Sequence, residues 1–412
     1  NITYKYAFSC SNKWDHLWAN LIFLTLKLLE FKYRKSKDTV ANFLIVEEPE
    51  AHIHHHIQKT LFDNLKFPNT QIIYSTHSAQ ISEVSNVENM NIVSRKINYS
   101  EVYQPSQGLE PANIDQIQRY LDAVRNNLLF AKGVILVEGD AEEIIIPIMI
   151  KMVFGVSLDE LGISLVNIRS TGFENVAQLF NDDRIRRKCA ILTDLDSAIC
   201  DTTPIPNDDE KIKKYKEKVA ASAKSGKERK SKLDELEKDN EWRKAFFADH
   251  TFEVDFIKAG NLDVVQSIIE KIYTDPDTRT LANDELGSGE ISIYGKRVLT
   301  MAKYAGKGWF AILLSGEITT ATKIPAYILD ALIFAKEDYS DLLLVDIIKY
   351  RLEIHNTISP GLYDFSNINN LLDKMILGEK VDLNEVRDEL SVISNDQIYS
   401  LVEKLIKEPE CV

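Results

Sequence analysis

Short apolar runs that end in polar clusters recur along the chain and predict an α/β architecture. The segments NFLIVEEPE (42–50) and TQIIYSTHS (70–78) each begin with the pattern of a buried strand, and the residues between them favour a helix. The runs GVILV (133–137), ISLVNI (163–168) and CAILTD (189–194) have the same form. Because these runs alternate with helical stretches, we expect parallel sheets with helices between the strands.

Other stretches of the chain follow a helical pattern. Residues 17–31, LWANLIFLTLKLLEF, predict a strongly apolar helix that is buried between other elements. Residues 201–245 predict a charged helical insertion, in which ten Lys or Arg residues between Lys211 and Lys232 stand against two acids. Such a helix is typical of a solvated surface, but it could also follow the phosphates of a nucleic acid. From about residue 320 the chain is mostly helical.

Composition narrows the classes of protein that the chain can belong to. Its 412 residues are 44% hydrophobic and 27% charged, which is typical of a globular protein with two or three domains. No run of about 18 apolar residues occurs, so we expect no membrane span. The four cysteines lack metal-ligand spacing and fit a reducing cytoplasm. The net charge of −14 does not exclude nucleic-acid binding, because charges act locally in salt.

Acids gather where two of the predicted strands end. Glu138 and Glu142 follow the run 133–137, and Asp194 and Asp196 end the run 189–194 or follow it. If these strands are neighbours in one parallel sheet, the four carboxylates converge at its carboxyl edge. Two unit charges about 4 Å apart repel by about 4 kcal/mol at an effective dielectric of 20, so the cluster requires a compensating cation. Oxygen ligands favour Mg²⁺ or Mn²⁺. In the same region, Asp140 and Glu143 are spaced as a capping box for the helix that follows.

The motifs carry two family resemblances. VEGDAE (137–142) followed by DLD (194–196) resembles the Toprim module of topoisomerases, primases and nucleases. FLIVEEPE resembles the end of the Walker B strand of ABC-type ATPases, which implies that Glu47 coordinates Mg²⁺ and that Glu48 orients the attacking water. IIYSTHS then supplies His77 in the position of the switch histidine that contacts the γ-phosphate of ATP.

An ABC-type ATPase joined to a Toprim module resembles the OLD (overcoming lysogenization defect) nucleases. HTFEVDF (250–256) is similar to a family segment that implies Glu253 as another metal ligand, with Asp255 nearby. YAGKGWFAILLS (304–315) is similar to a later segment and implies that Lys307 stabilises charge on the scissile phosphate. In this interpretation the catalytic set is Glu138, Glu142, Asp194, Asp196, Glu253, Lys307 and Glu48, and the same carboxylates from Glu138 to Glu253 are the metal ligands.

The resemblance also implies a domain organisation. We expect the second half of an ABC-type ATPase head over residues 1–110, a Toprim domain with a Rossmann-like parallel sheet over 111–320, which contains the charged helical insertion at about 205–245, and a helical C-terminal tail over 321–412. No GxxxxGK[ST] phosphate loop occurs in the sequence and the first residue is Asn1, so we expect the C-terminal portion of a longer protein, whose ATP turnover needs the rest of the head.

The function implied by the resemblance is metal-dependent cleavage of DNA under control of ATP, in cytoplasmic defence against phage or mobile DNA. We expect a homodimer or higher homo-oligomer, with DNA and a defence-system protein or RNA as candidate partners. The alternative is a nucleotide-gated DNA-binding or sensor protein whose Toprim domain does not cut. Composition does not separate these two hypotheses.

Overall fold

The computed structural model divides into two compact units, residues 1–130 and residues 131–412, and each is described by itself. The structure describes residues 13–34, 41–51, 53–96, 98–121, 125–169, 172–205 and 208–407.

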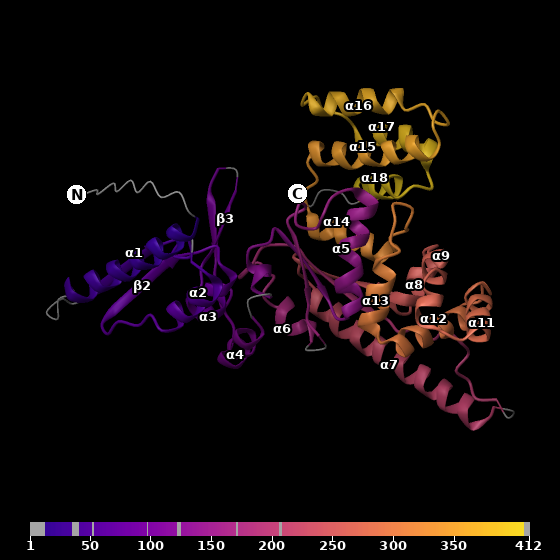
Figure 1. Cartoon of the computed structure of the whole chain (residues 1–412), viewed down its shortest axis with the longest axis horizontal. Coiled ribbons are helices and arrows are strands. Elements are labelled where there is room, and N and C mark those ends of the chain that lie inside the picture. The colour runs from indigo at the N-terminus through magenta and orange to yellow at the C-terminus, as the bar shows by residue number, and fades with distance from the viewer. Residues whose placement is uncertain are drawn as a thin grey trace. The chain divides into compact units, whose positions relative to one another are not determined.

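The first unit contains two small sheets with helices beside them (Figure 1). Strands β1 (Asn42–Glu47) and β2 (Thr70–Ser75) are parallel and run in register from Asn42 beside Thr70 to Glu47 beside Ser75. Strands β3 (Ile92–Arg95) and β4 (Ser100–Tyr103) form an antiparallel pair. The helices are α1 (Lys13–Arg34), α2 (His55–Asp63), α3 (Ala79–Val84) and α4 (Pro111–Tyr120), with 3-10 turns η1 (Val87–Asn89) and η2 (Arg125–Leu129).

The first parallel pair forms as predicted, but its strands are not buried. Apolar side chains on one face of β1 stay in solvent, with Phe43 59% and Ile45 75% exposed. Phe23 of α1 is also 62% exposed, although this helix is predicted to be buried. The physical reason is that, among the described residues, β1 pairs only with β2 and nothing covers the second face of this ribbon.

The second unit is built on a four-stranded sheet of β5 (Gly133–Val137), β6 (Ile163–Asn167), β7 (Cys189–Asp194) and β8 (Arg243–Ala248), in the order β6-β5-β7-β8. All of its pairings are parallel, and β5 lies between β6 and β7. Every residue of β5 is buried, which is expected for a central strand that is covered on both faces. The predicted α/β class with a parallel sheet is therefore confirmed.

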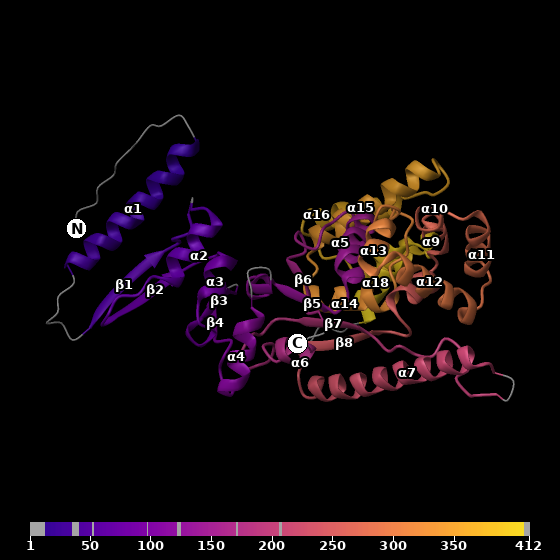
Figure 2. The ribbon, with the colours of Figure 1, turned by 60° about the horizontal axis from the view of Figure 1, so that its bottom comes forward.

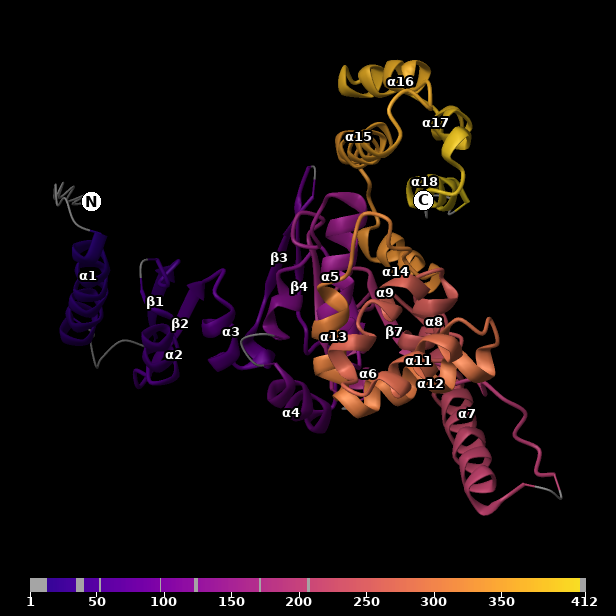
Figure 3. The ribbon, with the colours of Figure 1, turned by 45° about the vertical axis from the view of Figure 1, so that its right-hand side comes forward.

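Helices surround this sheet and extend the same core to the C-terminal end of the unit. Helix α14 packs against β5, β7 and β8, while α13 packs against α5. Figure 3 shows α15 to α18 grouped at one end of the unit. No helix in the described ranges is long and apolar enough to cross a membrane. The helices, other than α7, are α5 (Asp140–Phe154), α6 (Phe173–Ala177), α8 (Phe252–Lys258), α9 (Leu262–Gln266), α10 (Ile269–Ile272), α11 (Pro276–Leu286), α12 (Ile291–Ala305), α13 (Lys307–Ser315), α14 (Ala326–Lys336), α15 (Asp341–Ile358), α16 (Ser366–Ile376), α17 (Leu383–Leu390) and α18 (Gln397–Lys407), with the 3-10 turn η3 (Ser391–Ile393).

A buried arginine ties the C-terminal helices to the rest of the second unit. Arg351 of α15 is 5% exposed and donates hydrogen bonds from Nε to Asp396 Oδ1 over 3.0 Å and from Nη1 to the carbonyl of Val153 over 3.0 Å. Nη1 also donates to the carbonyl of Thr320 over 2.7 Å. Since a buried guanidinium needs such partners, this residue secures the helical tail to the end of α5.

The charged stretch forms α7 (Glu210–Glu237), which connects β7 to the adjacent parallel strand β8. Figure 2 shows α7 along one side of the sheet, with α5 and α13 on the other. Residues 243–248 are not predicted as a strand, because the charged residues before them obscure the short apolar run. The segment treated as an insertion is thus the crossover that brings β8 into the sheet.

Candidate functional site

The acids of the Toprim motifs meet at one edge of the four-stranded sheet of the second unit. Leu136 of β5 lies beside Ile191 of β7, so the predicted neighbourhood of these two strands is confirmed. Asp194 ends β7 beside Ala248, the last residue of β8. Because the strands are parallel, their carboxyl ends place the segments 138–142, 194–196 and 250–256 at the same edge.

Electrostatic interactions show that these side chains lie close together. Burial, and then the carboxylates of Glu253 and Glu138, raise the pKa of Glu142 to about 7, while Lys307 opposes this shift. Burial also raises the pKa of Asp194 well above its usual range, and the carboxylates of Glu142 and Glu253 add to the effect. The structure therefore brings together carboxylates from three segments of the chain.

Asp196 completes the cluster in a more balanced environment. Burial raises the pKa of this carboxyl group, whereas the cations of Arg229 and Lys307 act in the opposite direction. Its backbone adopts φ of 51°, in the left-handed region that few residues other than glycine adopt. The DLD loop therefore turns sharply where its second acid faces the cluster.

Lys307 is the cation that faces these acids from α13. The carboxylate of Glu253 is the largest cause that raises the pKa of Lys307, and Asp194 and Glu142 contribute in the same direction. Lys307 is the first residue of α13, where the helix dipole disfavours a positive charge. Glu253 itself is only 4% exposed, so the nearby ammonium group offsets a buried negative charge.

The glycine of VEGDAE has a steric role. A Cβ atom on Gly139 would lie 2.2 Å from Oε2 of Glu142, so this carboxylate folds back over the turn between β5 and α5. The expected capping box is wrong, because α5 begins at Asp140 with Gly139 as its N-cap. Instead, the side-chain amide of Asn167 donates to Asp140 Oδ1 over 3.2 Å and to Glu143 Oε2 over 2.8 Å. Asp140 and Glu143 are therefore bound by the side chain of Asn167 at the end of β6.

The donors of the cluster suit a hard divalent cation, but their arrangement does not yet enclose one. Carboxylate oxygens are the ligands that Mg²⁺ and Mn²⁺ prefer. Burial raises the pKa of Glu142 and of Asp194, and neighbouring carboxylates raise both further. Within the ranges that the structure describes, no three His, Cys, Asp or Glu side chains are arranged to hold a metal ion.

The residues assigned to ATP lie in the first unit, at the ends of β1 and β2. His77 Nε2 is 3.7 Å from Glu48 Oε1, and both side chains are exposed. Glu48 has φ of 41°, and Glu47 ends β1 beside Ser75. Glu50 Oε1 accepts a hydrogen bond of 2.6 Å from the backbone of His77. The structure therefore brings the predicted water-positioning glutamate and the switch histidine side by side.

Several residues at these sites are not found by sequence reasoning. Arg229 lies beside the DLD loop, but in the sequence it is one basic residue among many and belongs to no recognisable motif. The hydroxyl of Tyr327 on α14 is buried and has no hydrogen-bond partner among the described residues, and burial, followed by the charges of Asp194 and Glu142, raises its pKa. Glu50 also has a buried oxygen, Oε2, for which the described part of the chain supplies no hydrogen-bond partner. No sequence signal distinguishes these residues, because only the fold places them beside the acids.

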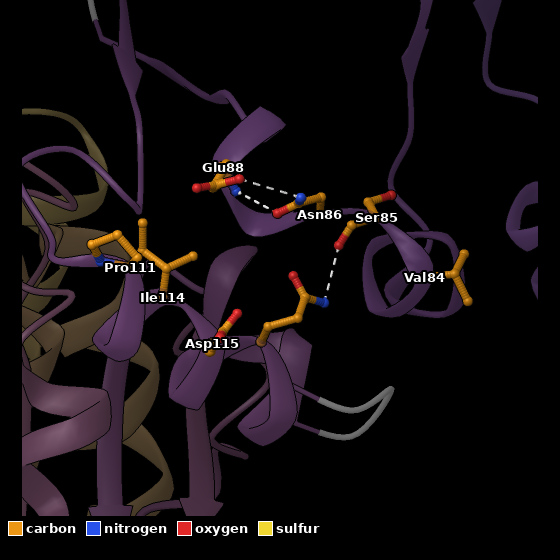
Figure 4. A pocket seen from close by; sticks show the side chains of 8 residues that line it. Val84, Ser85, Asn86, Glu88, Pro111, Ile114 and Asp115 are labelled. Carbon is orange, nitrogen blue, oxygen red and sulfur yellow. Dashed lines mark hydrogen bonds between the residues drawn. The ribbon is translucent and has the colours of Figure 1, made fainter.

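A small pocket of about 300 Å³ lies in the first unit (Figure 4). Gln118 lines it, and its side chain accepts a hydrogen bond from the backbone of Val87 over 2.8 Å and donates one to the carbonyl of Ser85 over 3.2 Å. None of the predicted site residues contributes to it. Its lining consists of Val84, Ser85, Asn86, Glu88, Pro111, Ile114, Asp115 and Gln118.

Comparison with known proteins gives two family matches. Residues 129–196 match the family described as overcoming lysogenization defect protein-like, TOPRIM domain, and residues 15–81 match the AAA ATPase domain. No curated protein matches the chain. Among solved structures, the C-terminal region of the Burkholderia pseudomallei OLD protein is 28% identical over 50% of this chain and 98% of its own length, with a TM-score of 0.37.

The C-terminal region of the Xanthomonas campestris pv. campestris OLD protein is similar to the chain at 24% identity, over 55% of this chain and 98% of its own length, with a TM-score of 0.35. Toprim and AAA ATPase domains generally use a divalent metal and a nucleotide. The chain therefore combines a segment similar to AAA ATPase domains with a segment similar to OLD-like Toprim domains, and this combination supports a nuclease-type ATPase.

Proposed function

We propose that the chain is a metal-dependent DNA endonuclease whose Toprim domain hydrolyses phosphodiesters under control of the ATPase head. The observation that carries this proposal is the convergence of Glu138, Glu142, Asp194, Asp196 and Glu253 with Lys307 at one sheet edge. Repulsion between clustered carboxylates destabilises the folded state, and such clusters are typical of catalytic sites.

The residues of the cluster have distinct roles in this proposal. Glu138, Glu142, Asp194, Asp196 and Glu253 would hold one or two Mg²⁺ or Mn²⁺ ions, which supply activation of water and neutralisation of phosphate charge. Lys307 holds a proton firmly beside these acids, and it would place its ammonium group against the scissile phosphate. In the head, Glu47 would coordinate Mg²⁺, Glu48 would orient water and His77 would contact the γ-phosphate of ATP.

The resemblance to OLD proteins supports further proposals about biological role, substrate and assembly. We propose cytoplasmic anti-phage defence as the role, DNA as the substrate, a homodimer or higher homo-oligomer as the assembly, and a defence-system protein or RNA as a partner. The alternative is a nucleotide-gated DNA-binding or sensor protein whose Toprim domain does not cut.

A plasmid-nicking assay separates the two functions. Wild-type protein with Mg²⁺ or Mn²⁺ is expected to nick supercoiled DNA, and Glu138→Gln or Asp194→Asn is expected to abolish nicking without loss of folding. Both substitutions remove charge from a repulsive cluster, so thermal unfolding of the metal-free variants should be unchanged or shifted upward. Wild-type nicking by both variants would exclude the Toprim acids from catalysis, and no nicking by the wild-type protein would favour the sensor.

A further inference from the structure

Helix α7 packs closely against the loop that carries Asp194 and Asp196. A Cβ atom on Gly226 would lie 1.8 Å from the carbonyl oxygen of Leu195, so only glycine allows the helix to approach the loop this closely. Leu233, two turns farther along α7, is 2% exposed. The helix is therefore docked on the catalytic unit and is not a free, solvated arm.

Arg229 makes the polar contacts across this junction. Its Nη1 donates to Thr193 Oγ1 over 3.0 Å and to the carbonyl oxygen of Asp194 over 2.9 Å. Its Nη2 is 3.6 Å from Asp196 Oδ2. One planar guanidinium thus contacts Thr193, Asp194 and Asp196 at once. The compact ammonium group of a lysine could not make all three contacts in this geometry.

The opposite side of the loop is held by the end of β8. The backbone N–H of Leu195 donates to the carbonyl of Ala248 over 2.9 Å, and that of Asp196 donates to the carbonyl of His250 over 2.9 Å. The loop is therefore held between the backbone after β8 and the guanidinium on α7. Because Asp196 has a positive φ, its unusual backbone conformation needs such support from its surroundings.

We propose that Arg229 is a positioning residue that holds Asp194 and Asp196 in the orientation needed for metal binding, and so couples the basic helix α7 to the metal site. This inference rests on the proposed function of the acid cluster. Partners that orient metal ligands from outside typically change metal affinity by about 10- to 100-fold when they are removed. The coupling also places the lysines of α7 on an element whose position determines the geometry of the DLD loop.

The test begins with metal-free protein and needs neither DNA nor activity. Hydrogen exchange of the amides of residues 194–197 is measured in wild type, Arg229→Gln and Lys238→Gln. Lys238 is exposed at the end of the same helix, so its substitution removes the same charge without touching the loop. We expect faster exchange in Arg229→Gln alone. Equal exchange in wild type and Arg229→Gln, or equal acceleration by Lys238→Gln, would overturn the proposal.

Metal affinity and turnover provide the second readout. Titration with Mn²⁺ alone is expected to show about 10- to 100-fold weaker binding by Arg229→Gln. In the nicking assay, kcat should fall while KM for DNA stays the same. Arg229→Lys keeps the positive charge but loses the planar set of guanidinium donors, so this variant should bind Mn²⁺ more weakly than wild type. Equal binding by Arg229→Lys would show that charge alone is needed and would contradict the positioning role.

A second variant keeps the inference testable if Arg229→Gln does not fold. Gly226→Ala favours the helix intrinsically but forces it away from Leu195, so it should loosen the loop with Arg229 intact. Wild-type exchange and Mn²⁺ affinity in Gly226→Ala would contradict the coupling. If wild-type protein neither binds Mn²⁺ nor nicks DNA, the proposed function fails, whereas the exchange measurement still decides whether Arg229 orders the loop.

Discussion

Glu142 illustrates how a carboxylate at this site works against the stability of the metal-free fold. Its pKa is raised from a usual value of 4.5 to about 7, first by burial and then by neighbouring carboxylates. Between these two values the folded state binds more protons than the unfolded state. Folding stability therefore rises as the pH falls through about 7 toward 4.5, and this contribution is lost at higher pH.

This linkage predicts a specific pH dependence. In the presence of a chelator, thermal unfolding should occur at a higher temperature at pH 6 than at pH 8, because Glu142 and Asp194 both have raised pKa values. Glu142→Gln should reduce this difference, since its neutral amide does not titrate. Added Mn²⁺ should also reduce it by stabilising the charged form. A difference of unchanged size in Glu142→Gln would exclude Glu142 as the titrating group.

At the scale of single residues, the sequence identifies the acids of the site more readily than the residues that position them. Glu138, Glu142, Asp194 and Asp196 are conspicuous because they stand at the end of an apolar strand or shortly after it. Arg229 belongs to a stretch with many basic residues, and nothing in the local pattern shows which of them turns toward the sheet. Its role depends on the crossover geometry, so it is visible only in three dimensions.

At the scale of elements, the central strands are predictable and the strand β8 is not. Strands β5 and β7 are buried on both faces, so their sequences are continuous apolar runs. Strand β8 starts with Arg243 and Lys244, and its burial is uneven along the strand. Its pairing with β7 decides its structure, and such long-range contacts are not visible in a short window of sequence.

Helix α7 allows a prediction about DNA binding. The exposed lysines Lys211, Lys214, Lys218 and Lys227 have no ion pair within the part of the chain that the structure describes. If they contact phosphates, replacing all four with Gln should flatten the slope of log K against log salt by roughly 3 to 4 units, at about 0.9 per contact. The loss should be similar for any DNA sequence, as measured by filter binding.

The matched control uses lysines of α7 that already have acidic partners. Lys213 is 3.7 Å from Glu210, and Lys224 is 3.9 Å from Glu228. Substituting these two lysines should change the salt slope less per residue than substituting the unpaired set. An unchanged slope in the fourfold variant would assign α7 a purely structural role, as the crossover between two strands.

At the scale of the whole molecule, the two units differ in how completely their apolar residues are covered. The second unit has a continuous core from Ile135 to Val402, which joins the sheet to the C-terminal helices. The apolar runs of the second unit make its parallel sheet predictable from the sequence. The burial of strands in the first unit is not predictable in the same way, because a strand pattern shows that a face is apolar but does not show what covers that face.

The uncovered face of β1 and β2 has a consequence for colloidal behaviour. Phe43, Ile45 and Ile73 are 59%, 75% and 47% exposed on a parallel ribbon whose segments are rich in β-branched residues. Exposed, uncharged segments of this kind pair with copies of themselves and seed aggregates. Ile45→Lys should therefore delay the onset of light scattering on warming, while Lys59→Gln, elsewhere on the unit's surface, should not. Equal scattering by wild type and Ile45→Lys would locate the aggregating surface elsewhere.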